Sequence, residues 1–188
     1  MKRRTEQVTQ TRDRIVEAAL RLFSEHGARG TTMTDVARAA DVSPATVLNH
    51  FATPELLLEA VVEQLLGLVR VPDETVFHGT RSASARITAL TSAMFAFFDR
   101  TERWFTLLGD ELTEVPVLAR AQKSFWEAIR GLYAQTLAGT ADPLLAKTVA
   151  GLIHPATFSA LKSTGMSVEE AARIVAESLV HQARRASR

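Results

Sequence analysis

The segment 32–49, TMTDVARAADVSPATVLN, constrains the fold more than any other part of the chain. Thr32 is a preferred helix-capping residue, and Asp35 three residues later completes a capping box for a first short helix. Ser43 caps a second helix that begins with Pro44, a position where the missing N–H group costs nothing. Only an Asp-Val pair separates the two helices. The segment therefore predicts two short helices joined by a tight turn.

The second of these helices cannot bury its solvent side. That side carries small or polar groups suited to a DNA groove, namely Pro44, Ala45, Thr46, Asn49 and His50. A helical hairpin of an ordinary bundle also explains the apolar periodicity. It does not explain why the second helix is short and polar on its outer side. We therefore interpret the segment as a DNA-binding helix-turn-helix.

Composition sets wider limits. The chain has 188 residues, 46% of them apolar, which is ordinary for a globular protein with a core. It has no cysteine, which excludes disulfides, thiolate metal sites and a cysteine nucleophile. No apolar run approaches the roughly 20 residues that span a bilayer, and the N-terminus lacks the pattern of a secretory signal. We expect a soluble, cytoplasmic protein with no membrane partner.

The net charge is +1, and the basic groups are concentrated slightly toward the N-terminus. The first 50 residues hold eight basic and six acidic groups, a net of +2. The run Lys2-Arg3-Arg4 is either a basic arm that neutralises phosphates or a solvated tail, and the sequence leaves both open.

Helical spacing of apolar residues runs through the whole chain, and no stretch alternates long enough to form a sheet. The sequence therefore predicts an all-α protein of about nine helices. A proline at position 155 should kink or break the helix that begins near residue 143. The predicted helices cover about residues 9–26, 32–40, 43–50, 53–70, 87–98, 102–114, 116–139, 143–163 and 167–185.

The order of these parts resembles the N-terminal domain of the TetR family of bacterial transcriptional regulators. The resemblance covers roughly residues 9–66 and is most specific from Thr32 to Phe51. The chain departs from the family pattern at four positions. The usual turn Gly is Asp41, the usual aromatic residue is Leu48, the usual Tyr or His is Asn49, and a frequent Lys is Pro54.

The resemblance implies two domains. Residues 1–52 would form an N-terminal arm and a three-helix DNA-binding domain, and residues 53–188 a helical effector-binding and dimerisation domain. The protein would be a homodimer, joined through its last two helices, that binds a palindromic operator in double-stranded DNA. Carried over by position, the base contacts are Pro44, Ala45 and Thr46, and the phosphate contacts are Thr32, Thr34, Ser43, Asn49, His50 and Thr53. Capping alone also explains Ser43 and Thr53, and packing under the helix also explains His50.

The resemblance further implies a cavity for a small-molecule effector that releases the repressor from DNA. The candidate lining residues are Met94, Phe98, Trp104, Phe105, Trp126, Tyr133, His154 and Phe158. Core packing is the commoner explanation for each of them taken alone, because aromatic stripes at helical spacing are mostly packing. Trp126, Tyr133 and His154 are favoured because they lie beside the apolar stripes and carry polar atoms, and the kink after His154 should free a backbone carbonyl nearby. Few of the candidates are charged, so we expect an apolar or aromatic effector.

Other functions are weighed against this interpretation. An enzyme would need convergent acids, bases or nucleophiles, but the five histidines are scattered and no metal-binding spacing occurs. We therefore expect no catalytic activity, no metal and no cofactor. A DNA-binding regulator without an effector, or an activator, remains an alternative.

Overall fold

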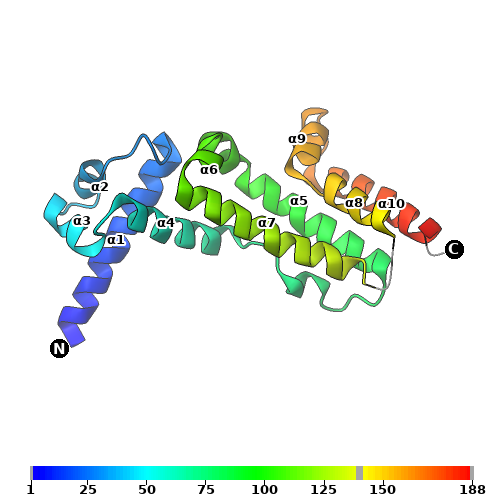
Figure 1. The fold of residues 1–188 in the computed structure, drawn as a ribbon, viewed down its shortest axis with the longest axis horizontal. Coiled ribbons are helices and arrows are strands. Elements are labelled where there is room, and N and C mark those ends of the chain that lie inside the picture. The colour runs from blue at the N-terminus through cyan, green and yellow to red at the C-terminus, as the bar shows by residue number, and fades with distance from the viewer. Residues whose placement is uncertain (1, 139–141, 187–188) are drawn as a thin grey trace. The chain divides into compact units, whose positions relative to one another are not determined.

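The computed structural model describes residues 2–138 and 142–186, and the regular secondary structure of these residues is all helical (Figure 1). It confirms the all-α prediction, with ten α-helices in the described part instead of about nine, because Pro155 divides one predicted helix into two. A short 3₁₀ helix, η1 (Glu74–Phe77), lies in the predicted loop. The α-helices are α1 (Lys2–His26), α2 (Met33–Ala39), α3 (Pro44–His50), α4 (Pro54–Val69), α5 (Ala83–Leu108), α6 (Glu111–Glu114), α7 (Pro116–Thr136), α8 (Pro143–Leu152), α9 (Pro155–Ser163) and α10 (Val168–Ala186).

The contacts divide the chain into two compact units. Unit 1 contains Met1–Val69 and Arg103–Lys123, and unit 2 contains Arg70–Glu102 and Ser124–Arg188. This division differs from the predicted boundary after residue 52, because α4 packs along α1 within unit 1. Helices α5 and α7 each contribute one segment to either unit. The assignment of one domain to DNA and another to an effector stays a prediction.

Unit 1 has a core built from the apolar faces of α1 to α4 and from the segment around α6. The apolar side chains recur every three or four residues along α1 and α4, so one stripe of each helix faces inward. The fully buried members include Ile15, Ala19, Val36, Ala37, Val47, Phe51, Leu57 and Val61.

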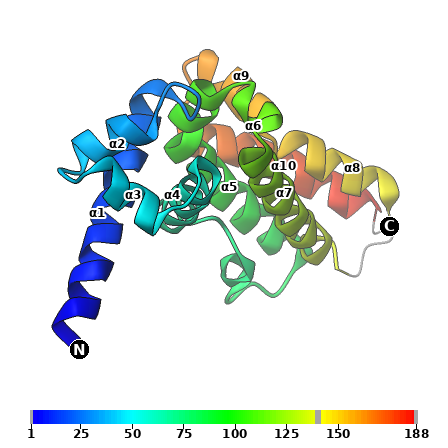
Figure 2. The ribbon, with the colours of Figure 1, turned by 60° about the vertical axis from the view of Figure 1, so that its left-hand side comes forward.

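Helix α1 begins at Lys2, seven residues before the predicted start near Thr9. Figures 1 and 2 both show its N-terminal half projecting beyond α2, α3 and α4, and its side chains from Thr5 to Gln10 are exposed. The run Lys2-Arg3-Arg4, which the sequence left open as a basic arm or a solvated tail, is part of helix α1.

The prediction of a break at Pro155 is confirmed. Helix α8 ends at Leu152, α9 starts at Pro155, and the two axes are bent by 53°. His154 caps α9, since its Nδ1 accepts a hydrogen bond from the Ala156 N–H at 3.2 Å. Proline is tolerated here because the first turn of a helix does not need its N–H group.

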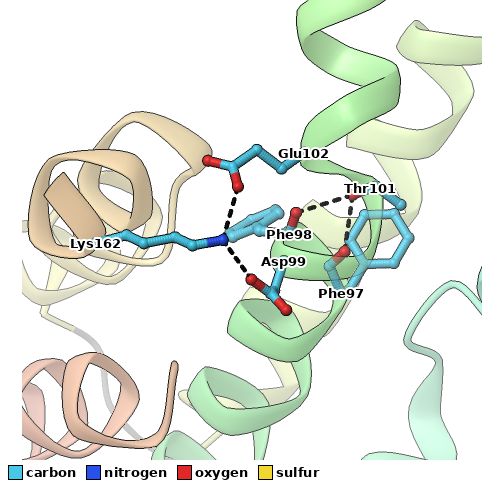
Figure 3. Close-up of polar contacts among 6 residues, drawn as sticks. All are labelled: Phe97, Phe98, Asp99, Thr101, Glu102 and Lys162. Carbon is cyan, nitrogen blue, oxygen red and sulfur yellow. Dashed lines mark hydrogen bonds and ion pairs between the residues drawn. The ribbon is translucent and has the colours of Figure 1, made fainter. Parts of the chain in front are cut away.

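Unit 2 is organised around aromatic side chains of α5 and α9. The buried Phe158 ring meets Phe95 edge-on at 5.3 Å between centroids and lies 6.2 Å from Phe98. At the other end of α9, Lys162 Nζ donates to Asp99 Oδ1 at 2.6 Å and to Glu102 Oε2 at 2.7 Å (Figure 3). These two hydrogen bonds raise the pKa of the Lys162 ammonium. Helix α9 is thus held on α5 by an apolar contact and an ionic one.

Tyr133 gives unit 2 a measurable pH dependence. Its buried hydroxyl donates to the Ile153 carbonyl at 2.6 Å, and burial raises the pKa of the phenol well above its ordinary value of about 10. Tyr133 is the single tyrosine of the chain, so phenolate absorbance reports on it alone.

We expect the unfolded protein to show phenolate absorbance near pH 10 and the folded protein to show it only at higher pH or on alkaline unfolding. Because the folded state holds this proton more tightly, the contribution to stability is complete below pH of about 10 and is lost as the pH rises further. Titration of the native protein near pH 10, with its helicity intact, would contradict the burial of Tyr133. The absorbance of urea-unfolded protein is the control.

Candidate nucleic-acid interface

The two helices of segment 32–49 form as predicted, and their starts are fixed by side-chain caps. Thr32 Oγ1 accepts from the Asp35 N–H at 3.2 Å, and Asp35 Oδ2 accepts from the Thr32 N–H at 3.3 Å. The hydrogen bonds from Thr32 lower the pKa of the Asp35 carboxyl, which therefore stays ionised at neutral pH. Ser43 Oγ accepts from the Thr46 N–H at 3.1 Å and so begins α3. The capping box that the sequence indicated is therefore complete.

The turn between α2 and α3 depends on Asp41. This residue has a φ of 53°, the left-handed conformation that glycine adopts most easily and that aspartate tolerates better than most residues. The Val42 N–H then donates to the Ala37 carbonyl at 3.0 Å, which closes the turn. The departure from glycine at this position therefore preserves the local geometry.

Val47 fixes the orientation of α3. Its side chain is 0% exposed in the core of unit 1, and at about 100° per residue the opposite side of the helix carries Ala45 and Asn49. Pro44 and Leu48 lie on one flank of that side, and all four residues are exposed. We call Pro44, Ala45, Leu48 and Asn49 the exposed face of α3.

The remaining predicted contact residues surround this face. Thr46 is half-buried and its hydroxyl lies 2.8 Å from Ser43 Oγ, while His50 is half-buried at the end of the helix. Thr53 Oγ1 accepts from the Leu56 N–H at 3.3 Å at the start of α4. All nine predicted DNA-contact residues belong to unit 1. Thr46 and His50 are half-buried, and the other seven are exposed: Thr32, Thr34, Ser43, Pro44, Ala45, Asn49 and Thr53.

Arg12 adds a basic group beside α3. Its guanidinium lies 5.0 Å from the centroid of Phe51, the residue that ends α3, and the side chain is exposed. A cation over an aromatic face is attracted to the ring and keeps its charge available to solvent. This pair connects α1 to the end of α3, a contact that the sequence pattern did not predict.

The turn that precedes α2 is held by a residue far away in the sequence. The Glu111 carboxylate accepts from the Ala28 N–H at 2.8 Å and from the Arg29 N–H at 3.2 Å, and Arg29 pairs with Glu114 at 2.6 Å. Gly27 has a φ of 74° there, and a Cβ at this residue would lie 3.0 Å from Glu111 Oε1. Sequence analysis missed this positioning role, because spacing along the chain carries no signal for partners more than 80 residues apart.

The predicted effector-binding residues are not all in the same unit. Trp104 and Phe105 belong to unit 1, where Trp104 packs against the core. The other six belong to unit 2. Met94, Phe98 and Phe158 are buried there, and the rings of Phe98 and Phe158 lie 6.2 Å apart.

The three favoured effector candidates have intramolecular partners in unit 2. Trp126 stacks on His154 with 5.5 Å between ring centroids, His154 is exposed and caps α9, and Tyr133 binds a carbonyl. The carbonyls that we expected the break at Pro155 to free are occupied. Gly151 O accepts from Thr157 Oγ1 at 2.9 Å, and Ile153 O accepts from Tyr133.

A groove of about 650 Å³ lies between α5 and α10 in unit 2. None of the predicted effector-binding residues borders it. Small side chains such as Ala85, Ser92, Ala172 and Ala176 line it, with charged groups including Glu169 and Arg173 at its edge.

Unit 1 contains a capped helix α2, a tight turn and a short helix α3 that is exposed on one side and anchored by the buried Val47. This is the arrangement of a helix-turn-helix domain, the kind that binds nucleic acid. Residues 15–61 match the family described as "Bacterial regulatory proteins, tetR family". This N-terminal segment, 47 of the 188 residues, is therefore similar to regulatory proteins of the TetR family.

The comparisons with individual proteins agree with this. The HTH-type transcriptional regulator BetI of Rhizobium meliloti (strain 1021) is 34% identical over 84 residues, which cover 45% of this chain and 41% of BetI. The chain thus matches less than half the length of this relative. The relative is named as a regulator and not as an enzyme.

Solved structures share the fold over most of the chain. The multidrug binding protein EbrR, complexed with imidazole, is 25% identical with a TM-score of 0.62 and covers 90% of this chain and 89% of its own. NalD, the secondary repressor of the MexAB-OprM multidrug efflux pump in Pseudomonas aeruginosa, is 21% identical with a TM-score of 0.65, over 94% and 96% of the two chains. The likeness to NalD concerns the fold alone.

No single helix within residues 2–138 and 142–186 has the length and apolar character to cross a bilayer, although the bent pair α8 and α9 has them when taken together. No group of three or more His, Asp or Glu side chains in that part of the chain is placed to hold a metal ion.

Proposed function

We propose that this protein is a DNA-binding transcriptional repressor of the TetR type. The observation that carries the proposal is the exposed face of α3. The four residues of this face are exposed to solvent, while Val47 anchors the helix in the core of unit 1. The helix lies within residues 15–61, which match the TetR family model. Such a helix fits the major groove of B-DNA. Because the regulation of bacterial transcription requires access to the chromosome, the proposal includes a cytoplasmic location.

In this proposal α3 enters the major groove. Pro44 and Ala45 meet base edges, and Thr46 contacts a base or a phosphate beside them. The phosphates on either side are contacted by Thr32, Thr34, Ser43, Asn49, His50 and Thr53. Capping and DNA contact are compatible in Ser43 and Thr53, because a hydroxyl that accepts from a backbone N–H still has its own proton to donate.

We also propose a homodimer that binds a palindromic operator, joined through the segments 143–163 and 167–185. Its support is the exposed apolar residues on these helices. Leu144 on α8 is 71% exposed and Ile174 on α10 is 40% exposed. Large apolar side chains on a helix surface, next to residues with small side chains, are typical of a contact with a partner helix.

The proposal also includes a small-molecule effector. An apolar or aromatic ligand is supported by the half-buried Trp126 stacked on the exposed His154, and by the imidazole complex of EbrR. The packing of Met94, Phe98 and Phe158 favours the second candidate function, a repressor without a small-molecule effector. Tryptophan fluorescence separates the two, because a ligand that displaces His154 changes the emission of the wild type and not of a Trp126→Phe variant.

The test of the proposed function is selection of fragments from bacterial genomic DNA by the purified protein at two salt concentrations. We expect a palindromic site that is retained at the higher salt, because contacts to bases depend less on counterion release than contacts to phosphates do. Weak binding to all fragments, lost steeply at the higher salt, would contradict sequence-specific regulation. A variant with Val47→Asp, which removes the buried anchor of α3, is the control for retention by the matrix.

A further inference from the structure

Leu48 has an environment that the family resemblance did not predict. Leu48 is 50% exposed, whereas the neighbouring Val47 in the same seven-residue helix is fully buried. Sequence analysis noted Leu48 only as a departure from an aromatic residue. An exposed leucine alone is unremarkable on a protein surface, but this one lies on the exposed face of α3.

The exposed face of α3 has an apolar part and a polar part. On a helix with about 100° per residue, Leu48 lies between Pro44 and Ala45 one turn earlier, so the three side chains form one apolar patch. Thr46, Asn49 and His50 lie on the other side of the face. The patch contains no group that donates or accepts a hydrogen bond.

Double-stranded DNA offers one apolar group in the major groove, the 5-methyl group of thymine. The other features of the base edges there are hydrogen-bond donors and acceptors, which an apolar patch would desolvate without replacing their bonds, and the C5–H edge of cytosine, which lacks the methyl group. Thr46 also offers a methyl group, but it is half-buried and its hydroxyl lies 2.8 Å from Ser43 Oγ. Leu48 is therefore the side chain on α3 that is both large and free to reach a thymine methyl.

We propose that Leu48 is a specificity-determining residue that selects thymine at one position of each operator half-site through the 5-methyl group. The inference rests on the proposed function, since it requires that α3 enters the major groove. A leucine cannot donate a hydrogen bond to a phosphate, so its contribution to DNA binding depends on an apolar partner. Pro44 and Ala45 extend the same contact along the groove.

The experiment uses the full chain and the operator obtained by selection. Each thymine of the half-site is replaced in turn by deoxyuridine, which removes only the methyl group, symmetrically in both half-sites. Affinities are measured for the wild type and for Leu48→Ala, Leu48→Met and Leu68→Ala. Leu68 is the matched control, because it is 64% exposed in the last turn of α4 in the same unit.

We expect one thymine position at which deoxyuridine weakens binding by the wild type about fourfold per half-site, the value for one buried methyl group. For the symmetric operator this becomes about fifteenfold. Leu48→Ala should bind more weakly and lose this dependence on the methyl group, whereas Leu48→Met and Leu68→Ala should keep it. Melting temperatures should not change, since Leu48 is exposed.

Two results overturn the inference while leaving the proposed function intact. One is a wild type that tolerates deoxyuridine at every position. The other is a Leu48→Ala variant that retains the full methyl dependence. Failure of the wild type to select any operator is a different outcome, since it contradicts the proposed function itself.

Discussion

Replacing Phe158 with alanine is expected to lower the free energy of unfolding by about 3–5 kcal/mol. The ring is 1% exposed and packs edge-on against Phe95, so truncation removes apolar contacts and leaves a cavity in unit 2. It also removes the ring that Lys162 Nζ approaches to 5.6 Å from the centroid. Urea unfolding followed by circular dichroism measures the loss, and Phe158→Leu, which fills most of the volume, should cost much less.

This result also bears on the effector. If Phe158 were the wall of a ligand cavity that is open in the free protein, truncation would enlarge an existing space and cost less than about 1 kcal/mol. Such a small loss would contradict the packed core described for unit 2. It would favour an effector site among Met94, Phe98 and Phe158. A loss in the expected range supports the alternative in which these residues are core.

Replacing Asn49 with alanine is expected to weaken binding to the selected operator about tenfold per half-site and about a hundredfold for a dimer. Asn49 lies opposite the buried Val47 on the exposed face of α3, and a hydrogen bond to a charged phosphate is worth about 1.5–3 kcal/mol. The two subunits contribute independently because their contacts are far apart. Fluorescence anisotropy with labelled operator measures the effect.

The melting temperature and the oligomeric state of Asn49→Ala should match those of the wild type, because the side chain is exposed. Gln64→Ala on α4 is the matched control, since it removes an amide of the same unit away from α3. Unfolding of the Asn49→Ala variant would show that this residue supports the fold. Unchanged affinity in a folded variant would show that Asn49 does not contact DNA.

The helices and their starts could be predicted from the sequence because their causes are local. Thr32 and Ser43 cap helices through residues three positions later, and Pro155 divides the predicted helix because its ring would clash with the carbonyl four residues earlier. A capping box of the same local kind starts α10, where the Ser167 backbone N–H donates to Glu170 Oε2 at 2.9 Å and Ser167 Oγ accepts from the Glu170 N–H at 3.2 Å. Boundaries without such a signal were wrong, as at the start of α1 and between α5 and α6.

The positions of the candidate DNA-contact residues could be predicted better than those of the candidate effector-binding residues, because only the former depend on local helix periodicity. The exposed face of α3 follows from the periodicity of a short helix, although Leu48 was not assigned to it as a DNA contact. The effector candidates were chosen as aromatic residues beside apolar stripes, and periodicity does not distinguish a core position from a cavity wall. Trp104 and Phe105 therefore joined a set whose other members lie in unit 2.

The sequence by itself determined the all-helical class, the helix-turn-helix and the break at Pro155, because each depends on interactions within about one helical turn. Only the tertiary structure decided which distant groups meet. Glu111 accepts a hydrogen bond from the turn before α2, and Lys162 joins α9 to α5. Both contacts form because the fold brings together residues 60 or more positions apart. Such partners depend on how apolar faces pack, and packing is not encoded in the spacing of any single segment.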